Sequence, residues 1–475
     1  MVSASPSDLR LDNLAEPVHF IGIGGIGMSA LARLLLKEGK RVSGSDKQPG
    51  EITHELESLG AKIFIGHNAE NVANAGCLVI STAIVNENPE LAAAKAKGLP
   101  VFHRSQMLAC LASASKAIAI TGTHGKTTTT GMVSQVLIDG GLDPSVVVGG
   151  IFERIGSNAR YGKGGYFVAE ADESDGTHTS FRSHIAVITN VEADHLENYP
   201  GGMEQIQEAM LKFAALAESK VILCADDAGC NALIPRIHRP TLTYGRIDKS
   251  PNANYQYESL AGFSMKIWHN KQLLGEVKLS VPGEHNKQNA MCAIAVGMEI
   301  GMTFEAAKSA IEAFGGVCRR FQIKGDVDGT VIVDDYAHHP TEVVATLQAA
   351  KQYLIAMDGN GKEAKARVVA VFQPHQPGRL RDLWKEFLQS FGDADLVLMT
   401  DIYVARGGAI EGITTEKFIS ELKHPNAKHL SGPTKDLPTK ITAFLQPNDL
   451  VLTIGAGDIT DVGGELVKCL KEKRG

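Results

Sequence analysis

Four residues in one short segment have the types and spacing needed to hold a chain of phosphates. They are Gly122, Gly125, Lys126 and Thr127, which follow an apolar, strand-like run and open a segment typical of a helix. Glycine lets the backbone approach an oxyanion closely, and the free amides at a helix start carry the positive end of the helix dipole. The lysine can reach the β- and γ-phosphates of a nucleotide, and the threonine hydroxyl can ligate Mg²⁺. We therefore predict a phosphate-binding loop. A glycine-rich turn without a ligand is the alternative, since Gly-x-x-Gly-Lys-Thr is two residues shorter than the usual motif.

A second glycine-rich loop lies near the N-terminus. Gly22, Gly24 and Gly27 follow another strand-like run and match Gly-x-Gly-x-x-Gly, and Asp46 ends the next strand, where a ribose contact would sit. By itself this pattern suggests NAD. The same turn can hold any nucleotide diphosphate, so the ligand stays open at this point.

Carboxylates follow several apolar runs that we interpret as strands. Glu173 and His195 each come shortly after such a run, in the polar stretches 170–175 and 189–195. Strand ends hold side chains rigidly, and hard oxygen ligands beside a phosphate loop suit Mg²⁺. We therefore predict these two residues as candidate metal ligands. Asp226 and Asp227 also follow a strand-like run, but we interpret them as a solvated turn.

The order of strand-like and helix-like segments predicts an α/β protein. With 475 residues the chain is long enough for about three domains. We expect a polar leader at 1–16, a Rossmann-like domain at 17–113, a central P-loop domain with a mostly parallel sheet at 114–315, and a Rossmann-like domain at 316–475. In the last domain, polar loops at 334–340, 373–381, 401–403 and 455–459 follow strands. Functional residues gather at the carboxyl ends of parallel strands, so these loops should share one edge of the sheet.

Composition excludes several classes of protein. The net charge of −7 argues against a surface that coats nucleic acid, which requires a basic face. The seven cysteines contain no Cys-x-x-Cys pair and are odd in number, which is typical of reduced core residues and not of a disulfide framework or zinc site. The first residues contain no apolar h-region, and the sequence has no run of about 18 apolar residues. We expect a cytoplasmic protein that is not inserted in a membrane.

Five motifs taken together resemble the Mur ligase family. They are the glycine loop His19–Ser29, the loop Gly122–Thr127, the acidic stretch Glu170–Asp175, Asp335–Pro340 and Phe372–His375, and the resemblance covers residues 17–465. It implies an N-terminal domain for a UDP-sugar, a central ATPase and a C-terminal domain that closes on both. Within the family, the motifs are most similar to members that join L-alanine to the lactyl carboxylate of UDP-N-acetylmuramate in cytoplasmic peptidoglycan precursor synthesis. The implied partners are therefore small molecules, and the implied state is a monomer or weak homodimer.

The resemblance also implies roles for individual residues. Those implied to bind the UDP-sugar are Gly22, Gly24, Gly25, Gly27, Asp46, Ser81, Thr82, Ala83, Arg104 and Ser105. Those implied to bind ATP are Gly122, Thr123, His124, Gly125, Lys126, Thr127, Thr128, Asn289, Arg320 and Asp335. The ligands implied for two Mg²⁺ ions are Thr127, Glu173 and His195, and the implied catalytic residues are Lys126, Glu173, His195 and His338. The amino-acid carboxylate would be bound by His375 and Arg379, because charge-assisted pairs suit a carboxylate.

Two loops depart from the family pattern. Gln376, Pro377 and Gly378 stand where Arg-Tyr-Ser is usual, and residues 403–408 replace the more familiar Tyr-x-Ala-Gly-Glu. Both lie near the expected amino-acid pocket, so a related ligase that adds another amino acid or a recycled peptide stays an alternative. A P-loop regulatory ATPase explains residues 116–195 but leaves the loops at 22–27 and 335–381 without a purpose. An NAD-dependent oxidoreductase uses the first loop but not Lys126.

Overall fold

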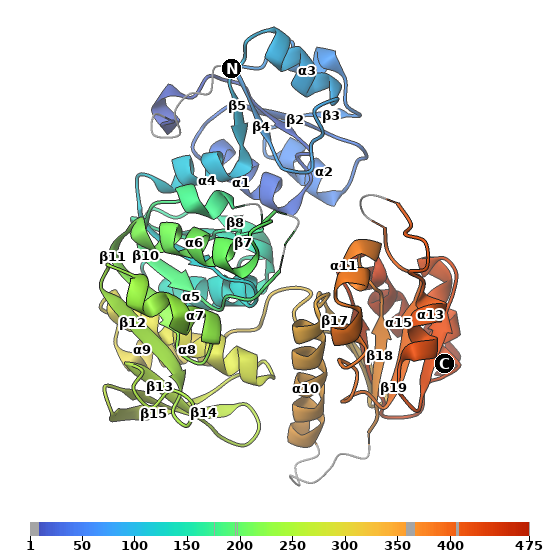
Figure 1. The fold of residues 1–475 in the computed structure, drawn as a ribbon. Coiled ribbons are helices and arrows are strands. Elements are labelled where there is room, and N and C mark those ends of the chain that lie inside the picture. Colours follow the sequence, from blue (N-terminus) through green and yellow to red (C-terminus); the bar gives the residue numbers. More distant parts are fainter. Residues whose placement is uncertain are drawn as a thin grey trace. The chain divides into compact units, whose positions relative to one another are not determined.

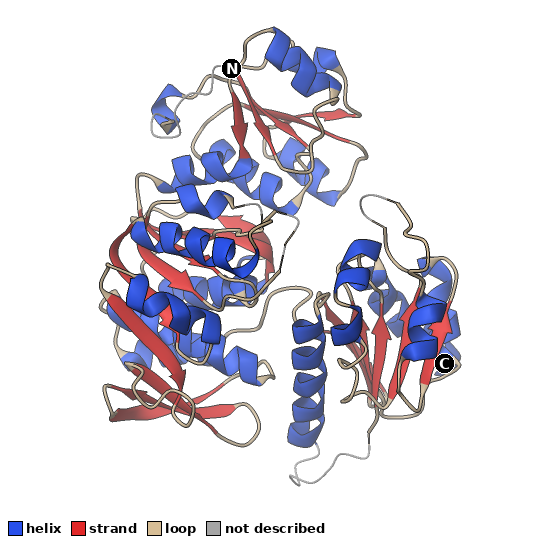
Figure 2. Ribbon diagram, viewed as in Figure 1, coloured by secondary structure: helices blue, strands red, loops and turns tan. Residues whose placement is uncertain are grey.

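The structure is a computed structural model and describes residues 9–174, 176–194, 196, 198–357, 366–404 and 408–474. Contacts divide the chain into two compact units. The first comprises Met1–Glu258, Ile267–Gly275 and Asn289–Ala313, and the second comprises Ser259–Lys266, Glu276–Gln288 and Phe314–Gly475. Figure 1 traces the chain and Figure 2 shows three sheets with helices packed beside them. The chain is therefore an α/β protein, as predicted.

The N-terminal sheet has five parallel strands in the order β3-β2-β1-β4-β5. Its elements are β1 (Val18–Ile21), α1 (Ile26–Lys37), β2 (Val42–Asp46), α2 (Glu51–Ser58), β3 (Lys62–Ile65), β4 (Cys77–Ile80), α3 (Pro89–Ala96), β5 (Val101–His103) and α4 (Arg104–Ala112). The chain runs outward from β1 to one side through β2 and to the other through β4. The loops after β1 and β4 therefore diverge, and such a switch point opens a crevice for ligands.

The last residues of the predicted leader contact the N-terminal domain. Leu14 is buried, Ala15 O accepts a hydrogen bond from the Cys77 thiol, and Glu16 Oε2 accepts the Arg41 amide at 2.8 Å. Of the predicted leader, residues 1–8 lie outside the described residues.

The central sheet has ten strands in the order β15-β14-β13-β12-β11-β10-β6-β9-β7-β8. Its strands are β6 (Lys116–Thr121), β7 (Ser145–Phe152), β8 (Ser157–Arg160), β9 (Tyr166–Glu170), β10 (Ser183–Ile188), β11 (Ala217–Cys224), β12 (Thr241–Arg246), β13 (Tyr255–Ser259), β14 (Ser264–His269) and β15 (Gln272–Lys278). Its helices are α5 (Lys126–Asp139), α6 (Gly202–Ala215), α7 (Ala228–Leu233), α8 (Glu284–Glu299) and α9 (Phe304–Glu312). β6 lies between β9 and β10 and is parallel to both, so the polar ends of all three strands meet at one edge.

The C-terminal sheet has six strands in the order β16-β17-β21-β18-β19-β20, and only β16 is antiparallel to its neighbour. Its strands are β16 (Gln322–Val327), β17 (Thr330–Asp335), β18 (Val368–Phe372), β19 (Leu396–Thr400), β20 (Ala427–Leu430) and β21 (Leu450–Ile454). Its helices are α10 (Pro340–Met357), α11 (Pro377–Asp382), α12 (Trp384–Phe387), α13 (Thr415–Glu421), α14 (Leu437–Thr442) and α15 (Ile459–Arg474). Along β18, Val368, Ala370 and Phe372 enter one core while Val369 and Val371 enter another. The sheet is therefore covered on both faces, and its parallel strands confirm that the four polar loops share one edge.

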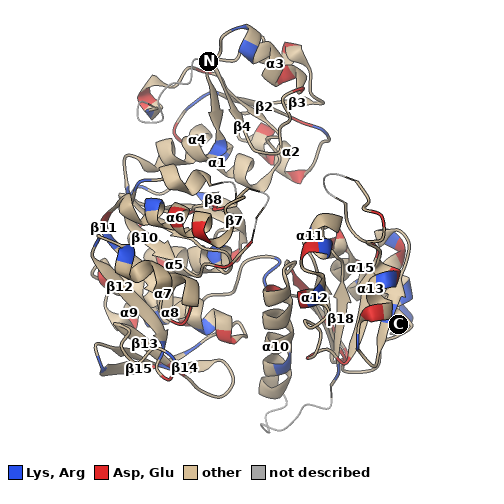
Figure 3. Cartoon of the chain, in the orientation of Figure 1, with Lys and Arg blue, Asp and Glu red and all other residues tan. Residues whose placement is uncertain are grey.

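Acidic and basic residues are interspersed along each of the three parts of the chain (Figure 3). Within the described ranges, no helix combines the length and the apolar character needed to cross a bilayer. Residues 358–366 are rich in glycine, lysine and glutamate, which predicts an exposed loop, but of these only Ala366 lies within the described residues.

Candidate active site

The backbone of the phosphate-binding loop is held in shape by the end of β10. Asn190 Oδ1 accepts the His124 amide at 2.7 Å, and Asn190 Nδ2 returns a hydrogen bond to His124 O at 3.0 Å. Gly122 has a φ of 130°, and a Cβ there would lie 2.2 Å from Thr189 Oγ1, so only glycine fits. Gly125, with a φ of 78°, precedes the first residue of α5. Sequence reasoning did not select Asn190, although its place at a strand end beside β6 was the available signal.

Lys126 is partly buried and forms an ion pair with the buried Glu173. Its ammonium lies 2.8 Å from Glu173 Oε1 and donates to Gly122 O at 2.6 Å and Thr123 O at 3.1 Å. Burial opposes the charge on Lys126, but the carboxylates around it, Glu173 first, outweigh this and raise its pKa. Burial also opposes the charge on Glu173, and it raises the pKa of this carboxyl to about 7 against the opposing effect of Lys126. The lysine therefore remains a cation at the start of α5, where phosphate charge would collect.

The residues predicted as metal ligands lie beside a further carboxylate. The Thr127 hydroxyl donates to Glu170 Oε2 at 2.9 Å, and the same oxygen accepts the Gly149 amide at 3.1 Å. The reason is that β9 runs beside β6, which places Glu170, the last residue of β9, opposite the first turn of α5. Glu170 is thus a site residue that the sequence reasoning missed. His195 lies outside the described residues.

The donor set fits a hard divalent cation. Glu173 Oε2 is buried without a hydrogen-bond partner among the described residues, while Thr127 and Glu170 supply a hydroxyl and a carboxylate nearby. Mg²⁺ is bound in proteins through one or two carboxylates together with substrate phosphates. The residues present therefore suit Mg²⁺ beside a nucleotide.

Two further residues predicted for ATP lie at this loop. Asn289 on α8 accepts the Thr129 hydroxyl at 3.1 Å, and a Cβ on Gly125 would lie 2.9 Å from Asn289 Oδ1. Asn289 therefore packs on the turn that opens α5. Thr128 lies in the first turn of that helix and is buried.

The first glycine loop is closed by oxygens from β2. Ser45 O accepts the amides of Gly22 and Ile23 at 2.8 and 2.9 Å, and Asp46 Oδ2 accepts the Gly24 amide at 2.9 Å. The carboxylate of Asp46, expected to face the ligand, therefore holds the loop itself. Gly25 precedes α1 and Gly27 lies in its first turn.

The remaining residues predicted for the UDP-sugar lie at two neighbouring strand ends. Ser81, Thr82 and Ala83 form the turn after β4. Ser105 Oγ lies 2.8 Å from His103 Nδ1 at the start of α4.

Arg104 links the N-terminal domain to the acidic stretch of the central domain. Its guanidinium forms an ion pair with Asp172. A Cβ on Gly27 would lie 3.7 Å from Arg104 Nη1, so the arginine also borders the first glycine loop. Burial by itself would raise the pKa of Asp172, but Arg104 and Lys126 outweigh it and lower that pKa.

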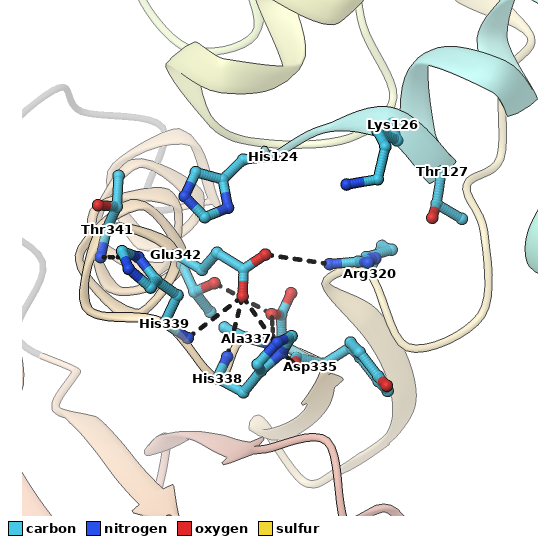
Figure 4. Close-up of polar contacts among 12 residues, drawn as sticks. His124, Lys126, Thr127, Arg320, Asp335, Ala337, His338, His339, Thr341 and Glu342 are labelled. Carbon is cyan, nitrogen blue, oxygen red and sulfur yellow. Dashed lines mark hydrogen bonds and ion pairs between the residues drawn. The ribbon is translucent and has the colours of Figure 1, made fainter. Parts of the chain in front are cut away.

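The loop after β17 is organised around a buried carboxylate. Asp335 Oδ2 accepts the Phe321 amide at 2.7 Å, and its Oδ1 accepts the Ala337 amide at 2.9 Å and the Thr346 hydroxyl at 3.1 Å. Burial raises the pKa of Asp335 to about 6, against the lowering effect of Arg320. Asp335, predicted to bind ATP, thus also shapes the loop (Figure 4).

Three residues predicted for catalysis or amino-acid binding come together in the second unit. The rings of His338 and His375 are 6.0 Å apart edge to face, and Arg379 Nη1 lies 3.5 Å from His375 Nδ1. His375 also stacks on Tyr403, with ring centroids 5.6 Å apart. Burial lowers the pKa of His338 to about 4, and Arg379 acts in the same direction. A guanidinium beside two imidazole rings is suited to binding a small carboxylate.

The atypical loop residue Gln376 has a φ of 71° and precedes α11. This left-handed region favours glycine, so the loop carries local backbone strain. Of the second atypical stretch, residues 405–407 lie outside the described residues.

Fold and site together define a three-domain nucleotide-binding protein with a P-loop and a separate diphosphate-type glycine loop. Three family models match the chain: the Mur ligase family catalytic domain at 17–116, the Mur ligase middle domain at 120–297 and the Mur ligase glutamate ligase domain at 319–457. The chain belongs to the Mur ligase family. ATP and Mg²⁺ follow from that membership.

Relatives match along nearly the full length. A UDP-N-acetylmuramate–L-alanine ligase of Geobacter sp. (strain M21) is 43% identical over 464 residues, covering 96% of this chain and 98% of that protein. One of Geotalea uraniireducens is 44% identical with the same coverage.

Solved structures of related ligases also match this chain along most of its length. The UDP-N-acetylmuramate–alanine ligase MurC of Thermotoga maritima superposes with a TM-score of 0.81 at 30% identity, covering 96% of this chain and 99% of that one. A murein peptide ligase of Psychrobacter arcticus shares the fold, with a TM-score of 0.70 at 24% identity and coverage of 95% and 98%.

Proposed function

We propose that this chain joins L-alanine to the lactyl carboxylate of UDP-N-acetylmuramate, converting ATP to ADP and phosphate, in peptidoglycan precursor synthesis. The observation that carries the proposal is the 42–44% identity, along nearly the whole chain, to ligases named for this reaction. A carboxylate is a poor electrophile, so the reaction requires activation. The γ-phosphoryl group passes to a lactyl carboxylate oxygen and ADP leaves, which gives an acyl phosphate. The alanine nitrogen then bonds to the carbonyl carbon, phosphate leaves with its electron pair, and the amine releases a proton.

The first glycine loop holds the diphosphate of the UDP-sugar. Its shape is set by Asp46 and Ser45, and the start of α1 presents amides at the switch point of the sheet. Helix N-termini with glycine-rich entries are suited to diphosphates. Arg104 borders the same loop and adds a cation there.

The second loop serves the phosphoryl group that is transferred. Lys126 neutralises charge on the β- and γ-phosphates, and positioning with charge neutralisation provides most of the rate enhancement in such transfers. Glu173, Thr127 and Glu170 would hold Mg²⁺, which supplies further positive charge at the phosphate oxygens. A second ion held by His195 is part of the same proposal, as is the role of His124 in contacting the acceptor.

The C-terminal domain supplies residues for the nucleotide and the amino acid. Arg320 and Asp335 belong to the ATP set, His338 to the reacting groups, and His375 with Arg379 to the alanine carboxylate. Exclusion of water from the reaction is expected, because acyl phosphates hydrolyse. The domain division at 17–113, 114–315 and 316–475, a cytoplasmic location and a monomer or weak homodimer complete the proposal.

The decisive experiment measures phosphate release from Mg-ATP by the purified protein. UDP-N-acetylmuramate is present throughout, and L-alanine, glycine, L-serine or the recycled tripeptide is added in turn. Release that requires both the UDP-sugar and L-alanine is the expected result. Preference for another amino acid or for the tripeptide would contradict the alanine assignment. No release with any acceptor would contradict the ligase activity.

A further inference from the structure

Glu342, the third residue of α10, lies where two functional segments of the C-terminal domain meet. Its Oε2 accepts the amides of His338 and His339 at 3.0 and 3.3 Å. The same oxygen lies 3.4 Å from His338 Nδ1. One carboxylate oxygen therefore holds the loop that ends in His338 (Figure 4).

The other oxygen of the carboxylate faces Arg320. Glu342 Oε1 lies 3.9 Å from Arg320 Nη1, and the glutamate side chain is only 15% exposed. Arg320 also lies over the Tyr336 ring, with its guanidinium carbon 5.1 Å from the ring centroid. The guanidinium is thus oriented by a carboxylate and by an aromatic face.

The backbone around Arg320 is fixed to the same loop. Arg319 and Phe321 have φ values of 62° and 48°, which are unusual for residues other than glycine. The Tyr336 amide donates to Arg319 O at 2.8 Å, and the Phe321 amide donates to Asp335. Because the backbone on both sides of Arg320 is bonded to this loop, Arg320 retains freedom mainly in its side chain, and Glu342 faces the end of that side chain.

Helix capping alone explains only half of these contacts. A glutamate at the third helical position commonly reaches back to the amide of the capping residue, and this is what Oε2 does at His339. A cap needs an oxygen that accepts hydrogen bonds, but it needs neither a negative charge nor an arginine opposite it. The approach to Arg320 is the contact that capping leaves unexplained.

We propose that Glu342 is a positioning residue that holds the guanidinium of Arg320 and the His338 loop in the arrangement that receives the phosphates of ATP. The inference rests on the proposed function, which assigns Arg320 to ATP. Arginine has several rotatable bonds, so ordering it before the nucleotide arrives improves binding.

If the charge of Glu342 is removed, a positioning role and simple charge repulsion predict opposite changes in the affinity for ATP. If Glu342 acted only through its charge, removing that charge near phosphate-binding residues would tighten ATP binding. If it positions Arg320, removing the charge weakens ATP binding because the guanidinium is no longer held.

The experiment compares Glu342→Gln, Glu342→Ala and the control Glu305→Gln, which changes an exposed glutamate at the start of α9. The dissociation constant for Mg-ATP is measured by titration calorimetry, so the result does not depend on which acceptor the enzyme uses. We expect Glu342→Gln to keep the thermal stability of the parent, because its amide oxygen still accepts hydrogen bonds. Its affinity for Mg-ATP should fall roughly tenfold, the effect of losing one charge-assisted contact. Glu342→Ala should also lose roughly 2–4 °C in Tm through loss of the cap.

A double-mutant cycle with Arg320→Met tests the path of the effect, because methionine removes the guanidinium that Glu342 faces. If Glu342 acts through Arg320, the Glu342→Gln change should have little further effect once Arg320 is methionine. Unchanged or tighter ATP binding by Glu342→Gln, or full additivity with Arg320→Met, would overturn the proposal and leave a helix cap only. Failure of the ligase activity itself would appear separately, as absence of phosphate release by the unaltered protein.

Discussion

The two glycine loops of this chain follow comparable strands, β1 and β6, and each opens a helix, yet they are built differently. In the first loop, oxygens of Ser45 and Asp46 take up amides and set the backbone. In the second, Lys126 at the end of the loop forms an ion pair with the buried Glu173. In the proposed function the first loop binds a diphosphate that does not react, so the shape of the loop suffices. The second serves the phosphoryl group that moves, so it needs charge that interacts more strongly as the transition state forms.

The largest expected effect is at the lysine of the second loop. Lys126→Ala should lower kcat by about 10³-fold or more, because the developing phosphate charge loses its cation. Lys97→Ala, which changes an exposed lysine at the end of α3, should leave kcat within about twofold, since surface changes away from a site have small effects. Phosphate release and circular dichroism provide the readouts. A folded and active Lys126→Ala protein would contradict the assignment.

The second prediction concerns stability and the buried residue Glu90, which holds Ser45 beneath the first loop. Glu90 is fully buried, and its Oε2 accepts the Ser45 hydroxyl at 2.6 Å and lies 3.5 Å from His19 Nε2. Burial alone would raise the pKa of Glu90, but hydrogen bonds from His19, Ser45 and Asn71 outweigh it and lower that pKa from 4.5 to about 2.

Because the pKa of Glu90 is lower in the folded than in the unfolded protein, its ionised carboxylate stabilises the fold at pH values above the unfolded pKa. This stabilisation is lost as the pH falls through the folded pKa. Glu90→Gln should therefore destabilise the protein by up to about 3 kcal/mol at neutral pH. The difference from the parent should shrink between pH 4.5 and 2. Urea unfolding at several pH values measures this, and a difference that does not depend on pH would contradict the assignment.

A smaller effect is expected at the residue that closes the first loop. Asp46→Ala frees the Gly24 amide and should raise KM for the UDP-sugar by about tenfold, the effect of one charge-assisted hydrogen bond, with kcat nearly unchanged. Asp46→Asn keeps an oxygen that can accept from Gly24 and should stay close to the parent. Steady-state kinetics with varied UDP-sugar separates them. A drop in kcat equal to that of Lys126→Ala would remove the distinction between the loops.

The smallest effect is expected outside both loops, at the candidate amino-acid site. Arg379→Lys keeps the charge but loses the planar donor pair, and should raise KM for L-alanine by about fivefold. The KM values for ATP and the UDP-sugar should not change. Equal KM values for alanine in the two proteins would show that Arg379 does not bind its carboxylate.

The sequence by itself determined the α/β class, both glycine loops and the polar strand ends. These depend on local physics: glycine spacing, helix starts and apolar runs act over a few residues along the chain. The motifs of the Mur ligase family were also readable in this way.

Tertiary structure alone decided which partners these residues have. Thr127 meets Glu170 and not Glu173 because β9 lies beside β6. Asp46 holds Gly24 because the ends of β1 and β2 lie side by side in one sheet, and Arg104 meets Asp172 because the fold brings the ends of strands from two different sheets together. Spacing along a chain specifies backbone conformation, whereas the choice among several nearby carboxylates depends on sheet order and burial, which only the folded chain contains.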